Sequence, residues 1–178
     1  MSPSSRMPAP PPPPTGVLTV ELVPSSCWFS NVRTVVSAAD WDKCKDFVRA
    51  RSGSLCEVCG GRGRRWPVEC HEVWRYDLPT EVQHLDGLVA LCPDCHGVKH
   101  FGYSQSQGKG AALMLHLARV NRWDLDRCEK YLESCFMLWH ARNQVHWELD
   151  ISYLSTIGID HTRYETPNRD ENFEVTFP

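Results

Sequence analysis

The sequence predicts an α+β protein built around a small module stapled by zinc. Two Cys-x-x-Cys pairs, Cys56 with Cys59 and Cys92 with Cys95, stand at a spacing that closes a tetrahedral zinc shell. Short apolar, strand-like runs lie between the pairs, and helical periodicity precedes and follows them. At 178 residues and 42% hydrophobic residues, the chain is long enough for one such domain with an appendage.

The chain divides into segments by composition and periodicity. Residues 1–16 are rich in proline and lack the apolar stretch of a signal peptide, so we expect a disordered tail. The remaining segments are an N-terminal strand and helix in 17–53, the zinc module in 54–103, a helical C-terminal segment in 111–160 and a flexible tail in 166–178.

The alternating, β-branched run 17–23 predicts a strand, and Ser37 and Gly53 are suited to cap the two ends of a helix. Inside the module we expect strands near 67–74 and 88–91, a polar loop over 75–83, and a helix that opens at His96. After a flexible loop over 104–110, the periodicity predicts helices over 111–120, 124–146 and 151–157.

Charge and cysteine content narrow the function classes. The formal net charge is −3, so a surface that binds nucleic acid must be local rather than general. Nine cysteines, an odd number without a secretory signal, favour a reducing, cytoplasmic setting over a disulfide framework. We see no stretch that approaches membrane-spanning length, and we expect no membrane partner.

Histidines exceed what one zinc shell can use. His96 and His100 stand four residues apart, so a helix places both rings on one face, a common arrangement for binding a divalent cation. His71 lies on the strand between the two cysteine pairs. This surplus predicts a second metal site, whereas we interpret His84, His116, His140, His146 and His161 as surface or core residues.

The segment 88–100, with the first cysteine pair and Glu69-Cys70-His71-Glu72 before it, resembles the HNH endonuclease family of the ββα-metal superfamily, in its cysteine-bearing, zinc-stabilised form. The resemblance covers about residues 54–103. It implies a ββα-metal fold and a metal-dependent endonuclease that hydrolyses nucleic-acid phosphodiester bonds, with DNA as the expected partner.

The resemblance also implies roles for individual residues. His71 matches the general base that activates water, and His96 and His100 match ligands of a catalytic cation, which is Mg²⁺, Mn²⁺, Ni²⁺ or Zn²⁺. The four structural zinc ligands that it implies are Cys56, Cys59, Cys92 and Cys95. The asparagine of the family signature falls at Gly87 here, and Cys70 stands before the base histidine.

Several charged residues are expected to support this site. Glu69 or Glu72 would orient His71 or complete the metal shell, and Asp86 or His84 would substitute for the signature asparagine. A local basic cluster would hold the nucleic-acid backbone. Its members are Arg62, Arg64, Arg65 and Lys99.

Two other functions remain open on the sequence. A non-catalytic zinc module that binds nucleic acid or protein would hold one tightly bound metal and no second site. A redox or zinc-sensing protein would lose its zinc reversibly on mild oxidation.

Overall fold

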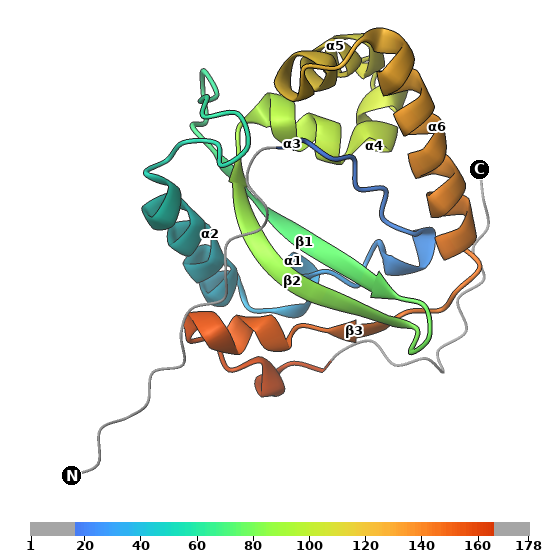
Figure 1. The fold of residues 1–178 in the computed structure, drawn as a ribbon. Coiled ribbons are helices and arrows are strands. Elements are labelled where there is room, and N and C mark those ends of the chain that lie inside the picture. The colour runs from blue at the N-terminus through green and yellow to red at the C-terminus, as the bar shows by residue number, and fades with distance from the viewer. Residues whose placement is uncertain (1–16, 166–178) are drawn as a thin grey trace.

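The computed structural model describes residues 17–165 and has a mixed helix and strand architecture, which confirms the α+β class (Figure 1). The predicted tails, 1–16 and 166–178, lie outside the described residues. The α-helices are α1 (Val32–Val35), α2 (Ala38–Ser52), α3 (Pro93–Lys99), α4 (Phe101–Ser106), α5 (Gly110–Asn121) and α6 (Leu125–Arg142). The 3₁₀ helices are η1 (Ser25–Cys27), η2 (Ser152–Ile157) and η3 (His161–Arg163).

A three-stranded sheet in the order β1-β2-β3 forms the centre of the fold. Strands β1 (Glu69–Asp77) and β2 (Val82–Leu91) pair antiparallel, and the short β3 (Glu148–Asp150) pairs parallel to β2. The polar loop expected over 75–83 is wrong, because most of it belongs to the two paired strands of this hairpin. Its polarity instead reflects exposure, as in the cross-strand ion pair of Arg75 with Asp86.

Helix α2 confirms the predicted N-terminal helix and both of its caps. The Ser37 side chain accepts a hydrogen bond from the backbone of Asp40, which satisfies one free N–H of the first turn. Gly53 ends the helix at φ 60°, a left-handed conformation that glycine adopts without steric cost.

The predicted strand over 17–23 is wrong. This segment is extended but pairs with no strand, because its backbone groups bond to side chains and to a helix terminus instead. The N–H of Leu18 donates to Asn121, that of Val20 to the Tyr131 hydroxyl, and that of Glu21 to the carbonyl of Lys99. We call residues 17–24 the strap, and it crosses between α3 and α6 (Figure 1).

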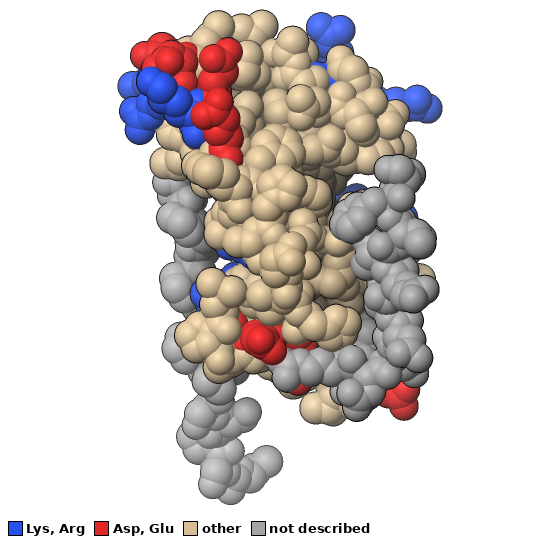
Figure 2. Space-filling view, turned by 90° about the vertical axis from the view of Figure 1, so that its right-hand side faces the viewer, with Lys and Arg blue, Asp and Glu red and all other residues tan. Residues whose placement is uncertain are grey.

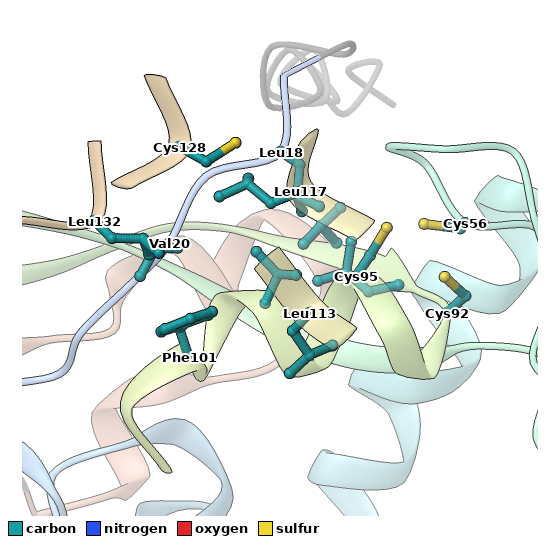
Figure 3. Close-up of a cluster of buried hydrophobic side chains, with 13 residues drawn as sticks. Leu18, Val20, Cys56, Cys92, Cys95, Phe101, Leu113, Leu117, Cys128 and Leu132 are labelled. Atoms are coloured by element: carbon teal, nitrogen blue, oxygen red, sulfur yellow. The ribbon is translucent and has the colours of Figure 1, made fainter. Parts of the chain in front are cut away.

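The hairpin separates two apolar cores. Successive strand residues point to opposite faces, so Val89 and Leu91 join one core while Leu88 and Ala90 join the other. The first core, drawn in Figure 3, packs the strap, α3, α5 and α6 together. The second packs α1, α2 and η2 under the sheet. Both faces of the hairpin are therefore fixed by packing.

The C-terminal part departs from the prediction in two places. Residues 104–106, expected in a flexible loop, complete α4, and Ser104 is held there by a hydrogen bond to the carbonyl of Gly97. The predicted helices over 111–120 and 124–146 are confirmed as α5 and α6, although α6 ends earlier, at Arg142. No helix among residues 17–165 combines the length and apolar character needed to cross a bilayer.

Charges are unevenly spread over the surface. Figure 2 shows the face over α6, where the visible described surface is mostly uncharged and the acidic and basic side chains gather toward its ends. The stretch of α6 from Ser134 to Ala141 contains no Lys, Arg, Asp or Glu. Trp28, Tyr103 and Met137 are among the large apolar side chains exposed in the described chain.

Candidate metal centres

Four cysteines converge as the sequence predicts. Cys56 and Cys59 lie in the tight turn that follows α2, Cys92 caps α3, and Cys95 lies in the first turn of that helix. Their sulfur atoms all lie within 4.8 Å of one another, and those of Cys59 and Cys92 are 3.6 Å apart. A tetrahedral shell with zinc–sulfur bonds of about 2.3 Å places sulfurs about 3.8 Å apart, so the cluster is compatible with structural zinc.

The cluster is set against the first apolar core. Figure 3 shows the sulfur atoms of Cys56, Cys92 and Cys95 gathered at one end of that core, next to Leu113 and Leu117. Of the four cysteines, only Cys59 is exposed. Zinc held here would join the turn after α2 to the start of α3 through bonds that an unfolded chain does not hold in place.

His116, expected to be an ordinary surface or core residue, instead contacts this cluster. Its Nε2 lies 3.1 Å from the sulfur of Cys95, and its Nδ1 accepts a hydrogen bond from Arg119 at 2.8 Å. Because Nδ1 is the acceptor, the proton sits on Nε2 and donates to sulfur. Such a bond stabilises a metal-bound thiolate from outside the ligand shell. One turn of α5 separates His116 from Arg119, but nothing in the sequence brings α5 to Cys95.

The three histidines also meet, from two different elements. His71 lies on β1, His96 lies in α3, and His100 lies at the C-cap of that helix. One ring nitrogen from each lies within 4.8 Å of the others, and the ring centroids are 4.8–5.2 Å apart. This confirms that the three rings gather at a place other than the four-cysteine cluster.

Glu21 of the strap is the site residue that the sequence did not indicate. Its carboxylate lies 2.9 Å from Nε2 of His71 and 2.5 Å from the ammonium of Lys99. Burial opposes its charge, but the hydrogen bond and charge of His71, together with Lys99, lower the pKa of Glu21 to about 2. An ionised Glu21 accepts the proton of Nε2, so Nδ1 of His71 keeps a free lone pair.

Glu69 orients the second histidine. The sequence led us to expect that Glu69 or Glu72 takes part in the site. The carboxylate of Glu69 does so, although it bonds Nδ1 of His96 rather than His71. The Nδ1 proton therefore points at Glu69, and Nε2 of His96 is left with its lone pair. Two of the three imidazoles thus have a carboxylate behind them, the pattern that fixes tautomer and ring orientation in metal-binding histidines.

Burial keeps His96 and His100 neutral. Desolvation, reinforced by the neighbouring His71 and His96 rings, lowers the pKa of His100 to about 3. Desolvation also lowers the pKa of His96, while Glu69 acts in the opposite direction. A neutral imidazole is the form that binds a metal, so His96 and His100 can bind a cation at neutral pH.

Three residues that were expected to support the site make other contacts. Lys99 is not part of a surface basic cluster, because its side chain is 8% exposed and paired with Glu21. Asp86 pairs with Arg75 at the exposed bulge of the hairpin rather than with a site histidine. Glu72 accepts the backbone N–H of Arg33, and burial raises its pKa to about 7.

The remaining basic residues lie on the loop between Cys59 and β1. Arg62, Arg64 and Arg65 are exposed, and Arg62 donates to the carbonyl of Gly53. Gly63 lets this loop close, because a Cβ there would lie 2.0 Å from the carbonyl oxygen of Trp66 and 2.6 Å from Pro93. The arginines are thereby held beside the four-cysteine cluster.

A pocket of about 710 Å³ opens from the three histidines. The strap, α4 and α6 form part of its wall, and residues of η1, α1, α2, α3, β1 and β2 also line it. This volume is within the range of small-molecule sites, roughly 300–1,000 Å³. The three histidines therefore lie in the wall of a pocket of small-molecule size.

The comparisons with known proteins give no relatives: no family model, no curated protein and no solved structure matches the chain.

Proposed function

We propose that the protein is a metal-dependent endonuclease of the HNH type, with structural zinc on four cysteines and a catalytic cation on the histidine cluster. The observation that carries the proposal is the convergence of His71, His96 and His100 away from the cysteines. The order β1, β2, α3, with the histidines on the first strand and on the helix, supports a ββα-metal module.

Phosphodiester hydrolysis needs a base for the attacking water and positive charge near the phosphate. A divalent cation supplies that charge when bound. His96 and His100 would hold it, because both are neutral and Glu69 leaves Nε2 of His96 free. His71 would take the proton from water on Nδ1, since Glu21 already accepts the proton of Nε2.

Glu21 would also stabilise His71 after proton transfer. The imidazolium that forms carries a positive charge next to an ionised carboxylate at 2.9 Å. An adjacent carboxylate raises the basicity of an imidazole and fixes its orientation, as in catalytic dyads. The strap thus contributes to the chemistry, not only to the packing.

The test is cleavage of supercoiled plasmid, single-stranded DNA and RNA with added Mg²⁺, Mn²⁺, Ni²⁺ or Zn²⁺. We expect cutting with at least one cation, and a loss of roughly 100- to 10,000-fold in His71→Ala, the usual contribution of a general base. His146→Ala, at an exposed position after α6, is the matched control and should cut as the unaltered protein does. Intact substrates with every cation, or equal cutting by His71→Ala, would end the proposal.

A non-catalytic zinc module that binds nucleic acid or protein is the second candidate. The observation in its favour is Lys99, which was expected in the basic cluster that holds the nucleic-acid backbone but which is buried against Glu21. This candidate predicts one metal ion per chain and no change in metal content in His96→Ala. The nuclease predicts a second, exchangeable ion that is lost in that variant.

A further inference from the structure

We propose that the pocket beside the three histidines receives an unpaired nucleobase, so that the substrate is a single strand or an unpaired segment rather than an intact duplex. The inference rests on the proposed function for the phosphate that it places at the histidines. Two features of the pocket carry it: the aromatic walls and a buried amide without a partner.

Aromatic rings line much of the pocket. The rings come from the end of η1, α2, β1, α4 and α6, and they are Trp28, Trp41, Trp74, Tyr103, Phe136 and Trp139. Flat aromatic faces stack on nucleobases with little regard to sequence. No such lining is needed to hold a phosphate, which takes charge and N–H groups instead.

Two of these rings are held in place by the strap. The indole N–H groups of Trp139 and Trp28 both donate to the carbonyl of Val23, at 3.0 Å and 3.3 Å. Their polar atoms are therefore satisfied, and what each offers the pocket is a ring. A platform fixed before binding loses little freedom when a ligand stacks on it.

Gln83 supplies the polar recognition. Its side chain is 1% exposed and lines the pocket, yet neither Nε2 nor Oε1 has a hydrogen-bond partner in the described part of the chain. Buried polar atoms are nearly always paired, so an unpaired amide in a pocket wall points to a ligand. An amide offers one donor and one acceptor side by side, the pairing that reads a base edge such as that of adenine.

The surroundings favour one strand over two. A duplex presents two phosphate backbones, and proteins that bind it carry basic side chains along both. The visible described face over α6 is mostly uncharged (Figure 2), and the chain carries a net charge of −3. A base inside the pocket must also have left its stack, which a single strand permits at little cost.

The test is binding measured without cleavage, by fluorescence polarisation of a labelled ten-nucleotide DNA strand with no divalent cation added to the zinc-loaded protein. An abasic strand of equal length should bind more weakly by roughly 5- to 150-fold, the usual value of stacking one base. A duplex of the same sequence should also bind more weakly. Equal binding of the abasic strand or of the duplex would overturn the proposal.

The variant is Gln83→Met, which keeps the length of the side chain and removes the amide. We expect at least a fivefold weaker affinity for the strand and no loss of thermal stability, because unpaired polar atoms leave the core. Gln83→Leu repeats the test if methionine does not fold, and Gln144→Met at an exposed position is the matched control. Unchanged affinity in the Gln83 variant contradicts the assignment.

Two further arms separate the alternatives. A deoxynucleotide monophosphate that competes as strongly as the strand would show that the pocket serves free nucleotides, which overturns the assignment to a strand. Base-dependent binding without cutting by any cation supports the pocket and removes only the nuclease. Cutting without base-dependent binding would support the nuclease and overturn the base-binding pocket.

Discussion

Glu72 lines the pocket with a buried carboxyl, and its ionisation should make the stability of the fold depend on pH. Burial raises its pKa from 4.5 to about 7, against a weaker opposite effect of the Arg33 N–H. Between these two pH values the folded chain keeps a proton that the unfolded chain has lost. The folded state therefore binds more protons, and the free energy of unfolding falls as pH rises through this window.

The magnitude follows from the shift. A change of about 2.5 pKa units at 1.36 kcal/mol each gives roughly 3 kcal/mol, and about 2 kcal/mol once solvent that reaches the pocket is allowed for. Glu72→Gln can still accept the Arg33 N–H but cannot ionise. We expect it to match the unaltered protein near pH 4.5–5 and to exceed its stability by about 2 kcal/mol at pH 8.

The assay is urea unfolding followed by tryptophan fluorescence at several pH values between 5 and 8.5, with the zinc content held constant. His96 and His100, whose pKa values are lowered by burial, act in the opposite sense, because they stabilise the fold as pH rises toward 6.5. The difference between variant and unaltered protein removes their contribution. Glu133→Gln, on the exposed face of α6, is the control. A stability difference that stays constant across this range would refute the reasoning.

Three further predictions concern the packing, the zinc cluster and the buried ion pair. Gly63→Ala should lower the free energy of unfolding in urea by roughly 2 kcal/mol or more, because its Cβ would lie 2.0 Å from a backbone oxygen. Gly87→Ala is the control, because a Cβ there meets nothing within 4 Å and should change stability little. Equal effects of the two substitutions would contradict the structure. Cys59→Ser should lower the zinc content by metal analysis and the thermal midpoint together, and a full zinc complement would speak against four cysteine ligands. Glu21→Gln should lower the free energy of unfolding by roughly 3 kcal/mol, because it leaves the ammonium of Lys99 buried without its carboxylate. The double variant with Lys99→Met should recover part of that loss. No recovery would mean that the two side chains are not coupled.

Local signals predicted much of this fold. The caps of α2 are visible as Ser37 and Gly53, and the spacing of the cysteine pairs predicted that their sulfurs meet. Helical spacing placed His96 and His100 on one side of their helix. These features depend on residues close in sequence, where periodicity and capping chemistry are informative.

The parts that the sequence missed depend on distant contacts. Glu21 reaches His71 across 50 residues, and His116 reaches Cys95 across 21. The strap has the alternation of a strand, but tertiary partners rather than a neighbouring strand satisfy its backbone, so pattern alone misled. Lys99 was expected in a local basic cluster, and only its contact with Glu21 of the strap explains why it is buried.

We propose above that three imidazoles form a cation site separate from the four thiolates. Anomalous diffraction from a crystal soaked in Mn²⁺ or Ni²⁺ tests it most directly, with data collected at the absorption edge of the added ion. We expect a second peak about 2.0–2.2 Å from the ligating nitrogens of His96 and His100, beside His71 and apart from the zinc at the cysteines. A map with metal at the cysteines alone would contradict it.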